Sequence, residues 1–145
     1  MEFNIIHQKL KEIQDNLELI TEHLPTDEEE FGTLGLVKDG MYKRLEFSIQ
    51  NLVDIFSMIY SSLNLGVPAD LDDIFEGLQR RKIFSKEIIK LVQEMKGLRN
   101  ILIHRYGEIN DVTIYGLLTE RIADFDTIMN AIEKYIQKAK PSKRS

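Results

Sequence analysis

The sequence predicts an all-α protein, an antiparallel bundle of four to five helices. Its apolar residues recur at alternating three- and four-residue steps, which is the period of a helix with one buried face. The 145 residues contain only 8 glycines and 3 prolines, and no segment alternates as a strand does. This length corresponds to one domain, which we expect to span residues 1–137, with a basic, flexible tail at residues 138–145.

The first predicted helix begins near the N-terminus and ends before Pro25. Its apolar stripe consists of Phe3, Ile6, Leu10, Ile13, Leu17, Ile20 and Leu24. Thr26 followed by Glu29 has the spacing of a capping box, which predicts a further helical stretch. Glycines weaken a helix after that point, so residues 32–36 stay unassigned.

The central helix is predicted from about residue 36 to residue 63. Its apolar stripe consists of Tyr42, Leu45, Ile49, Leu52, Phe56, Ile59 and Leu63. Gly66 and Pro68 break the pattern, and then Asp70 or Asp72 is expected to cap a short helix through Leu78.

Two more helices are predicted in the last third of the chain. Ser85 precedes an apolar run that defines a helix, and Gly107 is expected to stop it. Asp111 is then expected to cap one long final helix. The buried stripe of that helix consists of Ile114, Leu117, Leu118, Ile122, Phe125, Ile128, Met129, Ile132 and Ile136.

The composition excludes several classes of protein. Without cysteine there is no disulfide, thiolate zinc site or cysteine nucleophile, and three scattered histidines argue against a metal cage. No apolar run approaches the ~18 residues of a membrane span, and no signal peptide is apparent, so we expect a cytoplasmic protein without a membrane partner.

The charge is unevenly distributed along the chain. The net charge is -5, yet residues 1–31 carry nine acids and two bases, whereas residues 76–106 carry eight bases and three acids. Such asymmetry concentrates a polyanion on one region of an acidic protein, although solvated helix faces explain the same pattern.

The segment of residues 97–106 contains the candidate functional residues. On a helical wheel, Arg99 falls about 40° from Met95, inside the apolar arc. A guanidinium in that position is costly unless it lines a cleft or meets an anion. Ile101 and Ile103 fall outside the arc on its two sides, which favours a subunit interface and therefore a homodimer.

The same wheel separates Arg99 from His104, which falls near 180°. These two residues share a site only if the helix distorts near Gly107, if the arginine side chain reaches round, or if two chains combine their copies. We favour the third arrangement.

The pattern Arg99-x-x-x-x-His104-x-Tyr106, with Asn100 after the arginine, resembles the signature of the HepT-like toxins, a branch of the HEPN superfamily of helical ribonucleases. Further matching segments, in the same order, are Arg44-Leu45-Glu46, Asp54-Ile55, Leu65-Gly66-Val67-Pro68 and Ile74-Phe75-Glu76-Gly77-Leu78. The resemblance covers about residues 36–137. Arg105 departs from it, because the family usually has an acidic or small polar residue there.

The resemblance implies a homodimeric HEPN-like bundle that cleaves RNA at a composite site across the dimer cleft and leaves a cyclic phosphate. Cleavage requires no metal and no cofactor. His104 suits general acid–base work, Arg99 suits a bidentate grip on phosphate, and Asn100 orients the phosphate or the histidine.

The resemblance gives Tyr106 a different role. The matching tyrosine is AMPylated by a cognate MntA-like minimal nucleotidyltransferase antitoxin, which uses ATP and magnesium, and the added AMP blocks the cleft. This chain is accordingly interpreted as the toxin of a type VII style toxin–antitoxin pair, with Tyr106 as the silencing site.

Several alternatives remain open at this point. A salt bridge of Arg99 with Glu46 or Asp54 competes with a catalytic role, and His104 fits a surface or capping position. Contacts to the RNA backbone are predicted for Arg80, Arg81, Lys82, Lys96 and Arg105, although the first three also fit a solvated loop. The competing functions are a non-catalytic HEPN-like module that binds a nucleotide or a protein, and a plain helical scaffold.

Overall fold

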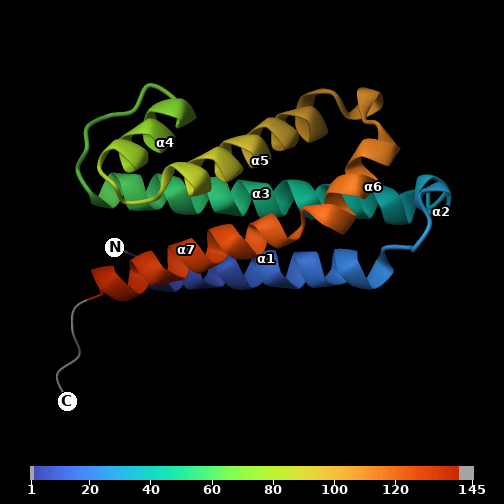
Figure 1. The fold of residues 1–145 in the computed structure, drawn as a ribbon, viewed down its shortest axis with the longest axis horizontal. Helices are drawn as coiled ribbons and strands as arrows, with labels where there is room; N and C mark the ends of the chain where they lie inside the picture. Colours follow the sequence, from blue (N-terminus) through green and yellow to red (C-terminus); the bar gives the residue numbers. More distant parts are fainter. Residues whose placement is uncertain (1, 141–145) are drawn as a thin grey trace, which may run out of the picture.

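The computed structural model describes residues 2–140, and every regular element in that range is helical (Figure 1). The elements are α1 (Phe3–His23), α2 (Glu28–Gly32), α3 (Leu36–Ser62), α4 (Leu71–Arg80), α5 (Lys86–His104), the 3-10 turn η1 (Tyr106–Glu108), α6 (Asp111–Glu120) and α7 (Ala123–Ala139). The all-α prediction is confirmed for the described residues. The predicted helix number was too low, since four long helices are joined by three shorter ones.

The four long helices α1, α3, α5 and α7 form an antiparallel bundle (Figure 1). Helix α3 lies in the middle, packing against α1 on one side and against α4 and α5 on the other. Helix α7 packs against α5 and runs along α1, while α6 covers α2 at the far end of the bundle. None of the helices within residues 2–140 combines the length and the apolar composition that a membrane crossing requires.

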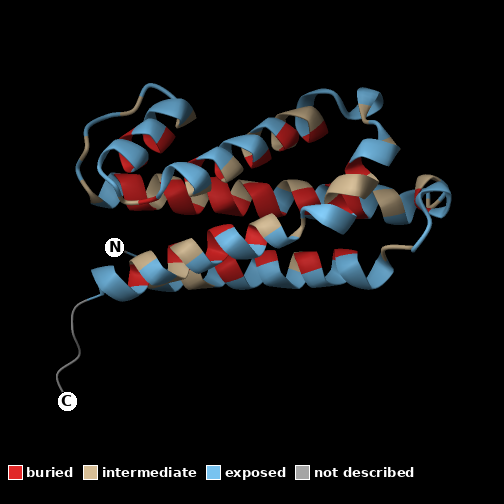
Figure 2. Cartoon of the chain, in the orientation of Figure 1, coloured by how far each residue is buried: buried red, intermediate tan, exposed pale blue. Residues whose placement is uncertain are grey.

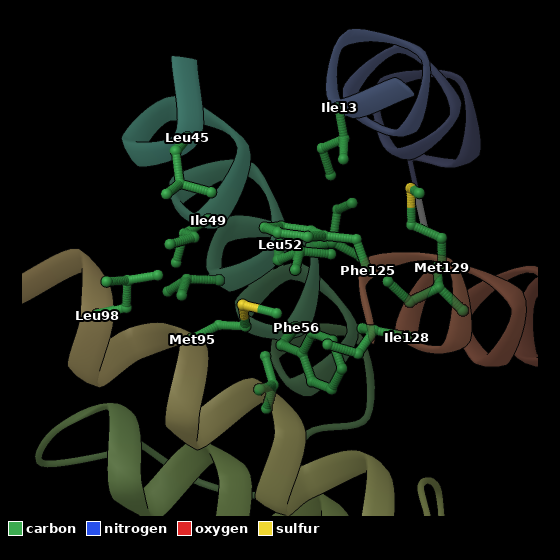
Figure 3. Packing of buried hydrophobic residues seen from close by; sticks show 14 of the residues in the cluster. Ile13, Leu45, Ile49, Leu52, Phe56, Met95, Leu98, Phe125, Ile128 and Met129 are labelled. Atoms are coloured by element: carbon green, nitrogen blue, oxygen red, sulfur yellow. The ribbon is translucent and has the colours of Figure 1, made fainter. Parts of the chain in front are cut away.

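The predicted stripes are buried over most of their length (Figure 2), and the members that are only partly buried are Phe3, Leu24, Leu63, Leu117 and Ile122. Side chains from all four long helices meet in one core, where Phe56 of α3 lies near Met95 of α5 and Ile128 of α7 (Figure 3). Each fully buried side chain of this size contributes about 1.5–3 kcal/mol. Helix α4 approaches α3 closely at Gly77, where a Cβ atom would lie 2.8 Å from Cε2 of Tyr60.

Three predicted helix ends were wrong by one to three residues. Asp27, not Thr26, caps α2 by accepting a hydrogen bond from the amide of Glu29. Asn110, not Asp111, caps α6, because its side chain reaches two amides of the first turn. Helix α5 ends at His104, before the predicted stop at Gly107. Of the two candidate caps Asp70 and Asp72, the structure shows Asp70, and Ser85 caps α5 by accepting a hydrogen bond from the amide of Ile88.

The predicted single final helix is in fact two helices, separated at Arg121 and Ile122. No glycine or proline marks this break. Nη2 of Arg121 instead lies 2.8 Å from Glu94 of α5 and 2.9 Å from Asp124 of α7. Helix α6 packs on α2 while α7 packs on α5, so the tertiary contacts decide the break. Helix α7 continues to Ala139, and residues 141–145 of the predicted tail lie outside the described residues.

Candidate active site and modification site

Helix α5 carries the three predicted catalytic residues, Arg99, Asn100 and His104. Ser85 caps its start, and Val92, Met95, Leu98 and Leu102 hold one face of it in the core. The helix is regular up to His104, so the rotation of about 100° per residue sets the direction of each side chain.

Arg99 lies half-buried between α5 and α3. Its Nη1 donates a hydrogen bond to Oε1 of Gln50 at 2.9 Å, and its Nη2 donates to Oδ1 of Asn100 at 3.3 Å. The Nε atom is buried and has no hydrogen-bond partner among the described residues. Both acceptors are neutral amides, so the positive charge of the guanidinium is not compensated by an ion pair within residues 2–140.

The alternative of a structural salt bridge at Arg99 is wrong in this structure. Glu46 pairs with Lys43 at 3.2 Å, and Asp54 pairs with Lys9 at 3.4 Å. Both carboxylates on α3 that competed for the arginine therefore have other cations.

Gln50 connects Arg99 to the rest of the bundle. Its Nε2 donates to Oδ1 of Asp54 at 2.8 Å while its Oε1 accepts from Arg99. Since Asp54 also accepts from Lys9 of α1, one chain of hydrogen bonds runs from α1 through α3 to α5. Sequence reasoning missed Gln50, although its position four residues before Asp54 places both side chains on one edge of α3.

His104 is the last residue of α5 and is exposed. Five steps of a regular helix place it about 140° from Arg99, and no hydrogen bond joins the two within the described chain. Gly107 lies in η1, beyond the helix, so a distorted helix does not bring them together. The predicted separation within one chain is confirmed.

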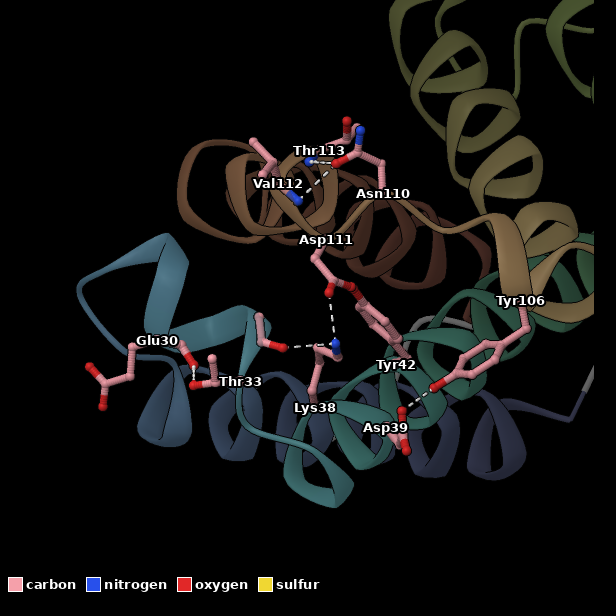
Figure 4. Close-up of polar contacts among 11 residues, drawn as sticks. Glu30, Thr33, Lys38, Asp39, Tyr42, Tyr106, Asn110, Asp111, Val112 and Thr113 are labelled. Carbon is pink, nitrogen blue, oxygen red and sulfur yellow. Dashed lines mark hydrogen bonds and ion pairs between the residues drawn. The ribbon is translucent and has the colours of Figure 1, made fainter.

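Tyr106 lies in η1, directly after α5, and its side chain is 45% exposed. Its Oη donates to Oδ1 of Asp39, in the first turn of α3, at 2.5 Å (Figure 4). Its ring stands edge-on to Tyr42, with 5.9 Å between ring centres. Burial, together with the hydrogen bond to the Asp39 carboxylate, raises the pKa of Tyr106 to about 12.

Asp111 ties this region to α6. Its carboxylate accepts hydrogen bonds from the hydroxyl of Tyr42 and, at 2.7 Å, from Nζ of Lys38 (Figure 4). Burial acts to raise the pKa of Asp111, but the hydrogen bonds from Lys38 and Tyr42 outweigh it and hold this pKa below its usual value. Sequence reasoning missed the roles of Asp39 and Asp111. Asp39 is 67 residues from Tyr106 in the sequence, and Asp111 lies outside the motif of residues 99–106.

A hollow of about 370 Å³ opens beside Tyr106 between α3 and α5. Its lining residues are Asp39, Tyr42, Lys43, Glu46, Leu102, Ile103 and Tyr106. The hollow is therefore apolar on the α5 side and carries two acids and one base on the α3 side. The side chain of Ile103 is 43% exposed at its rim.

The five basic residues predicted to contact RNA do not form one patch. Arg80 ends α4, and Arg81 and Lys82 are exposed in the connection before α5, whereas Arg105 follows the far end of α5, a helix about 27 Å long. Lys96 pairs with Asp72 at 3.2 Å, and Arg105 lies 4.0 Å from Glu108. Within residues 2–140 no three His, Asp or Glu side chains are grouped as metal ligands.

Comparison with known proteins identifies the family of this chain. The family model described as "Ribonuclease HepT-like" matches residues 13–132. The mRNA nuclease HepT of Shewanella oneidensis is 25% identical over 97 residues, which cover 67% of this chain and 73% of that protein. A putative RNase of Archaeoglobus fulgidus is 26% identical over 102 residues, which cover 70% of this chain and 76% of the relative.

Solved structures share the fold. The tri-AMPylated Shewanella oneidensis HEPN toxin in complex with MNT antitoxin has a TM-score of 0.79 at 24% identity, over 90% of this chain and 97% of that one. The cytosolic Bacillus subtilis protein YutE, of unknown function, has a TM-score of 0.79 at 15% identity, over 99% of this chain and 96% of that one. Since the family model spans most of the chain, the protein belongs to the HepT-like ribonuclease family.

Proposed function

We propose that this chain is the toxin of a type VII style toxin–antitoxin pair and acts as a metal-independent endoribonuclease. The observation that carries the proposal is the environment of Arg99, a half-buried guanidinium held by two amides and left without a counter-ion in the described chain. A cation kept in that state is suited to bind an anionic phosphate. The family supports the choice of RNA as the substrate.

The site we propose is completed by a second copy of the chain. Because Arg99 and His104 point in directions about 140° apart, two copies facing one another supply the pair more simply than one. The apolar side chains of Phe47 on α3 and Ile103 on α5 are 50% and 43% exposed, and a dimer would bury them. Both lie on the helices that carry Gln50 and Arg99.

In this mechanism His104 takes the proton of a ribose 2′-hydroxyl, whose oxygen attacks the adjacent phosphorus. The bond from phosphorus to the 5′-oxygen then breaks, that oxygen takes a proton from the protonated imidazole, and a cyclic phosphate remains on the other product. Arg99 binds the non-bridging oxygens, where negative charge develops, and Asn100 orients the phosphate or the histidine. Arg80, Arg81, Lys82, Lys96 and Arg105 contribute contacts to the RNA backbone.

Silencing is assigned to Tyr106. An MntA-like nucleotidyltransferase antitoxin, using ATP and magnesium, would attach AMP to its hydroxyl at the mouth of the hollow between α3 and α5. The adduct adds bulk and negative charge where the RNA phosphate is expected to bind. The related Shewanella toxin, which is described as tri-AMPylated and bound to an MNT antitoxin, supports this role.

The deciding experiment is RNA cleavage in EDTA by the unmodified protein and by His104→Ala. We expect the variant to lose at least about 100-fold in rate, because it lacks the acid–base group. His23→Ala is the matched control, since His23 is likewise an exposed histidine in the last turn of a helix. Size exclusion establishes that all three proteins have the same oligomeric state.

Equal cleavage by the parent and by His104→Ala would contradict the assignment of His104. Absence of cleavage by an intact parental dimer would favour the non-catalytic HEPN-like binding module instead. Loss of parental cleavage in EDTA, with recovery on adding a divalent metal, would contradict the metal-independent mechanism.

A further inference from the structure

The hydroxyl of Tyr106 is not free in the folded chain. It donates to the Asp39 carboxylate at 2.5 Å, and the ring is braced by Tyr42. The reacting atom of the proposed AMPylation therefore already has a hydrogen-bonded proton acceptor, and this acceptor belongs to the toxin and not to the antitoxin.

Among the described residues, Asp39 differs from the neighbouring carboxylates in forming no ion pair. Asp111 accepts from Lys38 and Tyr42, and Glu46 pairs with Lys43. Within residues 2–140 the only side-chain hydrogen bond of Asp39 is the one from Tyr106. An anion without a counter-ion is a better proton acceptor than one paired with a lysine.

We propose that Asp39 is the general base for AMPylation of Tyr106, so that the toxin supplies part of the chemistry that silences it. This inference rests on the proposed function, because it assumes that a nucleotidyltransferase presents ATP and magnesium to the tyrosine. Asp39 qualifies as a catalytic residue of that reaction because it contacts the reacting oxygen.

AMPylation of Tyr106 transfers the adenylyl group of ATP to the hydroxyl oxygen. Tyr106 Oη attacks the α-phosphorus of ATP, the bond from that phosphorus to the bridging oxygen of the β-phosphate breaks, and pyrophosphate leaves. The hydroxyl proton passes to Oδ1 of Asp39 and then to water. A base is required because a phenol with the ordinary tyrosine pKa of about 10 is already almost entirely protonated at neutral pH.

The test is the rate of AMP incorporation from radiolabelled ATP, with magnesium and the cognate nucleotidyltransferase, into the full-length toxin and its variants. Asp39→Asn keeps an oxygen that accepts the hydrogen bond but is not basic, so it separates proton transfer from positioning. We expect its AMPylation to be about 100-fold slower at pH 7. Glu46→Gln is the matched control, because it removes another acid from the same hollow without touching Tyr106.

The pH dependence distinguishes a base from a positioning residue. Without its base, Asp39→Asn depends on phenolate, so we expect its rate to rise about tenfold per pH unit from pH 7 to 9, far more steeply than that of the parent. The groups that face Tyr106 in this region are Asp39, Tyr42, Lys43 and Glu46, with Asp111 and Lys38 behind Tyr42. All of them except Asp39 are unchanged in this variant.

Three results of this experiment would contradict the proposal, each in a different way. No labelling of the parent would overturn both the silencing of Tyr106 and the role of Asp39. Labelling of the parent that is undiminished in Asp39→Asn would overturn the role of Asp39 alone. A slow Asp39→Asn variant whose rate changes with pH as the parent's does would make Asp39 a positioning residue and overturn its role as the base. A melting temperature and a size-exclusion volume equal to those of the parent show that the unmodified variant retains the fold.

Discussion

Arg99 and Tyr106 stand at the two ends of one short motif, yet the protein holds them by opposite means. Arg99 is half-buried and is bound by the neutral amides of Gln50 and Asn100. Tyr106 is nearly half exposed and is bound by the carboxylate of Asp39. A cation has neutral partners, and a neutral hydroxyl has an anionic partner.

This difference concerns the charge of Arg99 and the hydroxyl proton of Tyr106. Amide acceptors fix the position of a guanidinium without pairing it with a negative charge, so the charge of Arg99 is unpaired within residues 2–140. A carboxylate acceptor holds the phenol proton in place, so Tyr106 stays neutral in the folded chain. The following predictions test these two arrangements, beginning with the largest effect.

Removal of the Arg99 charge is expected to have the largest effect on cleavage. Arg99→Gln retains a polar side chain but no cation, so we expect RNA cleavage to fall about 100-fold or more. Arg44→Gln is the matched control, because Arg44 on the same helix as Gln50 also donates to an amide oxygen, that of Asn16, at 2.8 Å. Comparable losses in both variants would show that the charge of Arg99 has no special role.

Removal of the amide that holds Arg99 is expected to have an intermediate effect. Gln50→Met loses the hydrogen bonds to Arg99 and Asp54, so we expect a cost of about 1–2 kcal/mol in the free energy of unfolding. We also expect about tenfold slower cleavage, because the guanidinium is no longer fixed. Chemical denaturation and initial cleavage rates measure the two effects.

Asn16→Met is the control for that variant, since it breaks the exposed hydrogen bond from Arg44. We expect cleavage by this control to equal that of the parent. Unchanged cleavage by Gln50→Met as well would mean that Arg99 does not depend on Gln50 for its position.

The smallest effect concerns the dependence of stability on pH. The raised pKa of Tyr106 stabilises the fold below the ordinary tyrosine pKa of about 10, and this contribution is lost as the pH rises to about 12. The lowered pKa of Asp111 stabilises the fold above about pH 4, and that contribution is lost as the pH falls further.

Melting temperatures across the pH range test both signs. We expect Tyr106→Phe to reduce the fall of the melting temperature at alkaline pH, and Asp111→Asn to reduce the fall at acidic pH. Each change is expected to be a few degrees at most. We expect Gln50→Met to leave the pH dependence of the melting temperature at alkaline pH unchanged, because the amides around Arg99 do not titrate. A steeper alkaline decline in Tyr106→Phe would contradict the assignment.

Periodicity predicted most of the fold because burial in a helical bundle follows the wheel. The stripe from Ile6 to Ile20 on α1 and the stripe from Leu45 to Ile59 on α3 are buried as expected. The break at Arg121 was missed, since no helix-breaking residue marks it and it reflects the packing of α6 on α2 and of α7 on α5. The caps at Asp27 and Asn110 were missed because adjacent residues of similar type compete for the same position.

The candidate site divides in the same way. The sequence by itself determined the helical class, the long amphipathic helices α1, α3 and α5, and the position of Arg99 within an apolar arc, because these depend on the spacing of residues along one helix. Only the tertiary structure decided that Gln50 holds Arg99, that Asp39 holds Tyr106 and that Asp111 ties α6 to α3. Those partners are 49, 67 and 73 residues apart, and no local pattern encodes which polar side chains meet when separate helices pack.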